Sequence, residues 1–347
     1  MRSTIIRIAI WAFAALLLIV LLVLGINRTA LSMDLSGAGF TTTYDFSDSE
    51  AYRKEGATLP VGTNISAFEL DWIAGEIDIR FYDGDQIRFE ETAPRELSEN
   101  ETLRYLVSGE KLTIRFCEPK TGVLRTLKMP EKSLRVLLPK SLAGMDISVH
   151  NVSSSVYVDC DQTALRELIV ESVSGAVKII DARVPVLRVS TVSGSLVFKG
   201  VSDKADIETI SGAVALDFPI IPKQLRTDSV SGSVIVRVME NDGFTATLDS
   251  ISGRLTCDFA EMAGRKKAVY RNGRAGFAFH TISGSVTIAW LQGTPLSNGT
   301  NGKNEAIEEN ELPVAEPGPS LDLPAAEPKL PPGPQERVPV PSSGRKF

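Results

Sequence analysis

A six-residue phrase of the type Ser-Val-Ser-Gly-Ser-Val recurs through the middle of this 347-residue chain and constrains its fold more than any other feature. From a degenerate copy with Ser154 in place of the glycine, the glycine positions advance by 21, 19, 18, 20, 21 and 31 residues. A period near 20 residues is typical of stacked repeat units and is too short for propeller blades or tetratricopeptide helices. The repeat glycines, including one far upstream, are Gly75, Gly175, Gly194, Gly212, Gly232, Gly253 and Gly284.

Apolar residues keep fixed distances from these glycines. Counted from the glycine, positions −5, −2, +2 and +4 are apolar in almost every copy, for example Val170, Val173, Val177 and Ile179 around Gly175. Steps of two indicate a strand with one buried face. The step of three from −5 to −2 predicts a corner or bulge that keeps both residues inward. The sequence therefore predicts an all-β fold, a single elongated parallel β-solenoid of the β-helix kind, with rungs of about 20 residues stacked about 4.8 Å apart.

On this alternation the repeat glycine points inward between two aliphatic residues. Two explanations stay open: a side chain does not fit there, or the backbone needs a positive φ. The Ser or Ala residues on either side are expected to form outward ladders.

An uncharged apolar run from residue 8 to residue 26 predicts one transmembrane helix. At about 1.5 Å per residue it spans about 28 Å, close to the thickness of a bilayer's hydrocarbon core. Arg2 and Arg7 precede the run, which places the N-terminus inside and the bulk of the chain outside the cytoplasm. A cleaved signal peptide is the alternative, although Arg28 stands where a small-x-small cleavage site would lie.

The domain organisation follows from these segments. Residues 1–28 are predicted as a signal anchor, 29–61 as a linker, 62–291 as the solenoid and 292–347 as a disordered, acidic, proline-rich tail. The long step between Gly253 and Gly284 contains about ten extra residues, which are expected to project from the stack as a basic loop around Lys266.

The repeated rungs resemble the bacterial putative-adhesin family of β-strand repeat proteins of unknown function. Three further segments fit the family's order: Gly109 to Ile114, Leu134 to Pro139 before the repeats, and Asn272 to Phe279 before the last copy. The resemblance covers roughly residues 62 to 291. It implies an all-β solenoid attached to, or exported beyond, a bacterial membrane, and it implies no catalytic residues.

Position −4 carries the most conspicuous polar column. It contains both histidines of the chain, His150 and His280, among acids. The acids Glu208, Asp228 and Asp249 are expected on successive rungs, about 5 Å apart, where carboxylates repel one another unless they are solvated, capped or bridged by a cation. One hypothesis is a Ca²⁺ or Mg²⁺ site on this edge; the other is that each acid accepts backbone N–H bonds at its own corner.

The remaining composition argues against most other chemistry. The net charge of −6 gives no general attraction to nucleic acid, and two His with three Cys leave little for metal sites or a disulfide framework. Hydrolase, P-loop and zinc-protease motifs are missing from the sequence, and no cofactor is predicted. Cys257 is expected to be buried, whereas Cys117 and Cys160 either form a disulfide or remain thiols.

These observations predict a non-enzymatic, single-pass membrane protein with most of its chain outside the cytoplasm, acting in adhesion or scaffolding at the cell envelope. Its ligand would belong to the cell wall, a glycan or a protein. Two alternatives stay open: an accessory or sensory component of an envelope-stress or transport system, and a glycan-active β-helix enzyme whose paired carboxylates do acid–base work.

Overall fold

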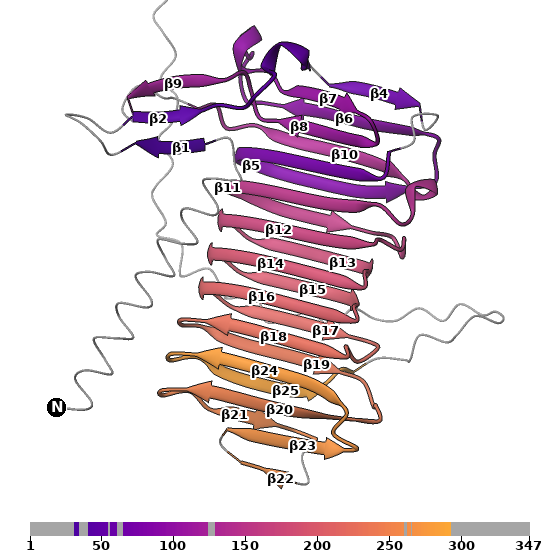
Figure 1. Cartoon of the computed structure of the whole chain (residues 1–347), viewed down its shortest axis with the longest axis vertical. Helices are drawn as coiled ribbons and strands as arrows, with labels where there is room; N and C mark the ends of the chain where they lie inside the picture. Colours follow the sequence, from indigo (N-terminus) through magenta and orange to yellow (C-terminus); the bar gives the residue numbers. More distant parts are fainter. Residues whose placement is uncertain are drawn as a thin grey trace, which may run out of the picture. The chain divides into compact units, whose positions relative to one another are not determined.

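The computed structural model describes residues 31–34, 41–54, 56–60, 65–123, 129–259, 262–264 and 266–292 (Figure 1). Within them the chain is all-β apart from three single-turn 3₁₀ helices, at Ser49–Ala51, Glu99–Glu101 and Lys140–Leu142, so the predicted all-β class is confirmed. The predicted anchor at 8–26 and the tail from 293 lie outside the described residues. Among the described residues, no helix has the length and apolar character needed to cross a membrane.

Each rung of the stack consists of two strands joined at a corner. The first strands are β12 (Glu167–Ser174), β14 (Val186–Ser193), β16 (Lys204–Ser211) and β18 (Gln224–Ser229). The second strands are β13 (Val177–Arg183), β15 (Leu196–Val201), β17 (Val214–Phe218) and β19 (Ser233–Val238). First strands pair in parallel with first strands, and second strands with second strands. The repeat phrase forms the corner between the two faces.

Two long strands begin the regular stack. β5 (Ala67–Tyr82) and β11 (Asp146–Asp159) each run through the corner without a break and pair in parallel from end to end. Gly75 of β5 lies opposite Ser154 of β11, so the isolated upstream copy of the repeat is a true rung. The intervening residues therefore form a separate element of the fold.

Those intervening residues, with the preceding segment, cover the N-terminal end of the stack. β10 (Ser133–Pro139) pairs in parallel with β5, and β6 (Gln86–Thr92) pairs antiparallel with β10. β7 (Arg104–Ser108) and β8 (Lys111–Arg115) form a hairpin whose second strand lies beside the first half of β5.

Short strands also occupy the stretch 29–61 that was expected to be a linker. β3 (Arg53–Lys54) pairs with β7, and β4 (Ala57–Pro60) pairs with β6. β1 (Leu31–Asp34), β2 (Thr41–Tyr44) and β9 (Lys120–Val123) form a separate three-stranded antiparallel sheet.

The C-terminal end does not follow sequence order. β20 (Gly243–Ser250) and β21 (Leu255–Cys257) form the outermost rung, whereas β24 (Ala275–Thr281) and β25 (Ser285–Trp290) return and insert between them and β18–β19 (Figure 1). The predicted projecting loop is also wrong. Its residues form a hairpin of β22 (Met262–Ala263) and β23 (Lys267–Arg271) that pairs antiparallel with β20 and closes the stack.

The core between the two faces confirms three of the four predicted columns. Positions −5, +2 and +4 are buried along the stack, as at Val170, Val177 and Ile179. The prediction for position −2 is wrong: Val173 and most of its equivalents lie half-exposed on the corner, whereas Ile73 is buried and Ile251 is exposed. The strand keeps its alternation up to position −3, so the buried residues there are mostly Ser or Thr.

The repeat glycine does not point into the core. At Gly194, with φ +149°, an added Cβ would lie 2.1 Å from the carbonyl oxygen of Gly175 on the preceding rung. Both open explanations therefore hold at this position, since a side chain would collide with backbone and the conformation is one that L residues rarely adopt. At Gly253 and Gly284 only the close approach applies.

Serines complete the corner. The hydroxyl at position −1 donates a hydrogen bond to the carbonyl at position −2 of the neighbouring rung, as from Ser153 to Ile73 at 3.1 Å and from Ser174 to Val152 at 3.2 Å. The Ser-Gly pair thus serves the stacking of rungs, which accounts for its recurrence.

The cysteines differ from expectation in one respect. Cys117 and Cys160 are buried, and no disulfide joins them in the described residues. Burial raises the pKa of the Cys160 thiol to about 12, which keeps it protonated and unreactive. Cys257 is half-buried, contrary to prediction, because its strand β21 belongs to the outermost rung.

Candidate functional site

Position −4 forms one continuous row of polar side chains on the outer side of the face made by the first strands. We call it the ladder. In the order in which the strands stack, it contains Asp71, His150, Glu171, Ser190, Glu208, Asp228, His280 and Asp249. Neighbours are in register on adjacent parallel strands, which spaces them about 4.8 Å apart.

The N-terminal end of the ladder is a buried charge network. Asp71, 1% exposed, forms an ion pair with Arg115 of β8 and lies 2.9 Å from Nδ1 of His150. Glu69 accepts hydrogen bonds from Lys111 at 2.5 Å and from Arg115 at 3.0 Å. Burial alone would raise the pKa of Glu69, but these two cations outweigh burial and lower it. The network joins β8 to the first two rungs.

The opposite end is more accessible. Asp228 accepts a hydrogen bond from Arg226 at 2.6 Å, and its carboxylate lies 2.8 Å from Nδ1 of His280. Burial, followed by the charge of Asp228, raises the pKa of Glu208. Two acids on adjacent strands thus repel each other, and the Arg226 guanidinium offsets part of this repulsion.

The three acids expected on successive rungs are not contiguous. Glu208 and Asp228 are neighbours, but His280 lies between Asp228 and Asp249 because β24 inserts between β18 and β20. In the part of the chain that the structure describes, no group of three or more His, Cys, Asp or Glu side chains is arranged to hold a metal ion. The predicted cation ladder of Glu208, Asp228 and Asp249 therefore does not form in that order.

The Asp71–His150 pair has the geometry that orients a catalytic histidine, but its surroundings serve a different role. The other ring nitrogen of His150 lies 3.9 Å from Glu171, a carboxylate, where a triad would present a hydroxyl or thiol. Among the described residues, both ring nitrogens of His150 therefore lie near carboxylates.

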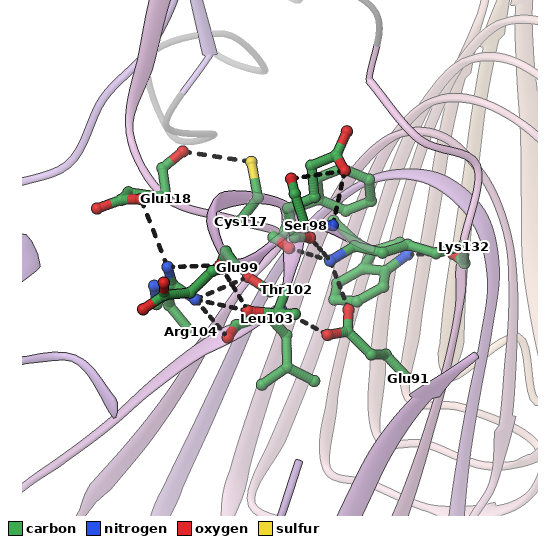
Figure 2. Close-up of polar contacts among 12 residues, drawn as sticks. Glu91, Ser98, Glu99, Thr102, Leu103, Arg104, Cys117, Glu118 and Lys132 are labelled. Carbon is green, nitrogen blue, oxygen red and sulfur yellow. Dashed lines mark hydrogen bonds and ion pairs between the residues drawn. The ribbon is translucent and has the colours of Figure 1, made fainter. Parts of the chain in front are cut away.

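A second polar cluster, which the sequence analysis missed, surrounds Lys132 (Figure 2). Its side chain is fully buried, and its ammonium donates hydrogen bonds to Glu91 at 2.5 Å and to the carbonyls of Glu101 at 2.6 Å and Phe116 at 2.5 Å. The ammonium also lies over the ring of Trp72, 5.0 Å from its centroid. Burial lowers the pKa of Lys132, although the charge of Glu91 opposes this effect.

Beside it, Arg104 donates to the backbone carbonyls of Glu99 and Thr102 (Figure 2). Each proton of the Lys132 ammonium already has an acceptor, so this ammonium holds chain segments together and has no donor left for a ligand. Lys132 follows no repeat and lies in a short polar stretch before β10, so periodicity alone could not identify it.

The comparisons with known proteins bear on the same part of the chain. Residues 65–218 match the family described as Toastrack DUF4097. This chain contains a Toastrack DUF4097 domain. The match begins just before β5 and ends with β17, so it includes the ladder from Asp71 to Glu208 and is shorter than the predicted span of 62–291. The resemblance to a putative-adhesin family of unknown function is confirmed.

Two solved structures resemble the chain at low similarity. One is a "putative cell adhesion protein" from Clostridium sporogenes ATCC 15579, 14% identical, with a TM-score of 0.35, covering 69% of this chain and 100% of that one. The other is a "putative adhesin" from Bacteroides fragilis NCTC 9343, 10% identical, with a TM-score of 0.33, covering 69% of this chain and 98% of that one. No curated protein matches the chain.

Proposed function

We propose that this protein is a non-enzymatic adhesion or scaffolding protein, anchored in the cell membrane through residues 8–26, with its Toastrack domain outside the cytoplasm. The observation that carries the proposal is the ladder, a row of evenly spaced polar side chains along one face. A regular row favours a ligand that makes many weak contacts at once, because linked contacts add to avidity without any single deep pocket. The uncharged run at 8–26 supports the anchor.

The chemistry of the ladder narrows the ligand class. Acids outnumber the two histidines, and Glu208 and Asp228 bring two carboxylates together at its accessible end. This favours an envelope or cell-surface ligand that presents repeated positive groups, such as a cationic glycan or a basic protein surface.

The test uses the full-length chain in lipid nanodiscs and measures co-sedimentation with polylysine-coated beads, which present repeated positive groups. Glu208→Gln with Asp228→Asn removes two ladder charges. Asp159→Asn with Asp258→Asn removes two carboxylates from the opposite face and is the matched control. We expect the ladder variant to lose binding, about tenfold or more in apparent affinity, and the control to retain it.

Two outcomes would overturn the proposal. Equal binding by the ladder variant and its control would mean that the ladder is not the contact surface. Release of soluble fragments from a polysaccharide by the wild-type chain would instead establish the glycan-active enzyme.

A further inference from the structure

The outer corner of the solenoid carries an apolar ridge that the described residues leave partly open to solvent, except at its first member, Ile73. In stacking order the ridge consists of the residues at position −2: Ile73, Val152, Val173, Val192, Ile210, Val230, Ile282 and Ile251. Most are half-exposed, and Ile251 is 59% exposed. Aliphatic side chains in an unbroken exposed row are typical of an interaction surface.

On the side of the second strands, the surface beside the ridge is neutral except at its two ends, whereas the ladder at position −4 borders the ridge on its other side. From position −1 to position +1 the corner contains Ser, Ala and Gly through the six inner rungs. At position +1 the first rung has Glu76, and the outermost rung has Arg254. Both side chains are exposed, and neither forms an ion pair with another described residue. Seven strand spacings separate the two levels, or about 34 Å.

We propose that this corner is the interface of a symmetric dimer of the chain, with the two solenoid axes antiparallel. A twofold axis that lies in the interface, perpendicular to the stack, reverses the order of rungs and keeps each column facing its own equivalent. The ridge of one copy then packs on the ridge of the other, and Glu76 of each copy meets Arg254 of the other. The twofold axis therefore forms two equivalent ion pairs, one at each end of the interface.

The alternative dimer geometry lacks this complementarity. A twofold axis along the stack would place the first rung of one copy on the first rung of the other. It would also reverse the order of the columns across the corner, so position +1 of one copy would face the opposite side of the corner on the other. Glu76 and Arg254 would then face neutral residues and stay unpaired. Two copies also share one rung spacing, so that a second copy matches the ridge along its whole length, which a partner of unrelated shape would not.

Association through the ends of the stack is less favourable. The antiparallel strands β6 and β23 replace parallel rungs at the two ends, and the last strand, β22, has only two residues. Short, irregular edge strands disfavour pairing with another sheet. The ends are thus less suited to self-association than the corner.

The test measures the mass of the full-length chain in detergent by sedimentation velocity, over a range of concentrations. Wild type is expected to form dimers. Glu76→Arg places Arg against Arg254 twice, and Arg254→Glu places Glu against Glu76 twice, so each variant alone should weaken the dimer about tenfold or more. The double variant restores opposite charges at both ends and should restore the dimer.

A mixture of the two single variants gives the sharpest result. In a heterodimer, Arg at position 76 meets Glu at position 254 and the native Glu76 meets the native Arg254, so differently tagged single variants should capture each other while neither captures itself. Ser108→Glu, in the hairpin of β7 and β8, is the control for added charge and should leave the dimer intact. A monomeric wild type, or a dimer indifferent to these charge changes, would overturn the proposal.

Discussion

At the scale of the residue, the repeat phrase encodes a corner. Gly194 lets the backbone turn where the carbonyl of Gly175 approaches, and Ser193 lies beside it within hydrogen-bonding reach of the Val173 carbonyl, at 3.5 Å. The valine at position −2 lies outside because the strand alternation holds until the buried hydroxyl at position −3. The phrase therefore specifies how one rung sits on the next, and the core is specified by the residues on either side.

Gly194→Ala should be strongly destabilising. The added methyl group meets backbone at 2.1 Å and the residue keeps φ +149°, so we expect a loss of at least about 2 kcal/mol in the free energy of unfolding. Gly276→Ala, in β24, is the matched control, because nothing lies within 4 Å of its added Cβ. That change should be neutral or slightly stabilising. Urea unfolding followed by circular dichroism compares them, and equal midpoints would contradict the explanation.

The raised pKa of Glu208 predicts a pH-dependent effect. The folded protein holds this proton to higher pH than the unfolded chain, so ionised Glu208 opposes folding near neutral pH, and the effect vanishes as the pH falls below the ordinary carboxyl range. Glu208→Gln should raise the free energy of unfolding at pH 7 by about 0.5 kcal/mol, a small value because the side chain is only partly buried and solvent screens its charge.

The gain from Glu208→Gln should shrink toward zero near pH 4. Thermal unfolding across this pH range is the measurement, with the exposed Glu90→Gln in β6 as a control that should show no such trend. A gain that grows on acidification would refute the assigned direction of the pKa.

At the scale of the element, the N-terminal cap depends on a buried ion. Lys132 precedes β10 and ties together three segments that the repeat does not organise: the end of β6 at Glu91, the 3₁₀ turn at Glu101 and the end of β8 at Phe116. A carboxylate, two carbonyls and an aromatic ring compensate for removing the ammonium from water. Separating the ammonium from these groups would leave buried polar atoms without a partner, which costs free energy. The cluster therefore holds the segments of the cap in one arrangement.

Lys132→Met should destabilise the cap by about 3 to 5 kcal/mol, because it leaves the carboxylate of Glu91 beside apolar side chains without its cation. Adding Glu91→Gln should recover part of the loss. The control is Lys140→Met, which removes a surface lysine that pairs with Asp83 and Asp161 and should cost less than about 1 kcal/mol. Similar unfolding midpoints for the variants at 132 and 140 would refute a special role for Lys132.

At the scale of the whole molecule, the order of rungs departs from the order of the sequence. β20 and β21 precede β24 and β25 in the sequence but lie further out in the stack. The β22–β23 hairpin reverses the direction in which rungs are added. This insertion places His280 between Asp228 and Asp249, so it alters the charge pattern of the ladder. It also puts Arg254 at the far end of the corner, where the proposed dimer requires it.

The sequence alone predicts the all-β class, the parallel stacking, the 20-residue rung and three buried columns, because each depends on a period that repeats along the chain. It also indicates that Gly75 belongs to a copy of the repeat, since its neighbours keep the same spacing. The same spacing wrongly predicts that Val173 is buried. Spacing gives the distance between residues along the strand, but it does not show on which side of a corner a side chain lies.

The remaining features depend on which strands meet. The rungs of Gly253 and Gly284 share the same sequence pattern. The pattern alone therefore does not show which of the two stacks on the rung of Gly232. The hairpin between them decides the order, because it brings the later rung back to the free edge of β18 and β19. Lys132 likewise becomes buried only when β6, β8 and β10 assemble around it. Local periodicity thus determines the rung, whereas the order of rungs, the ladder and the cap result from contacts between segments far apart in the chain.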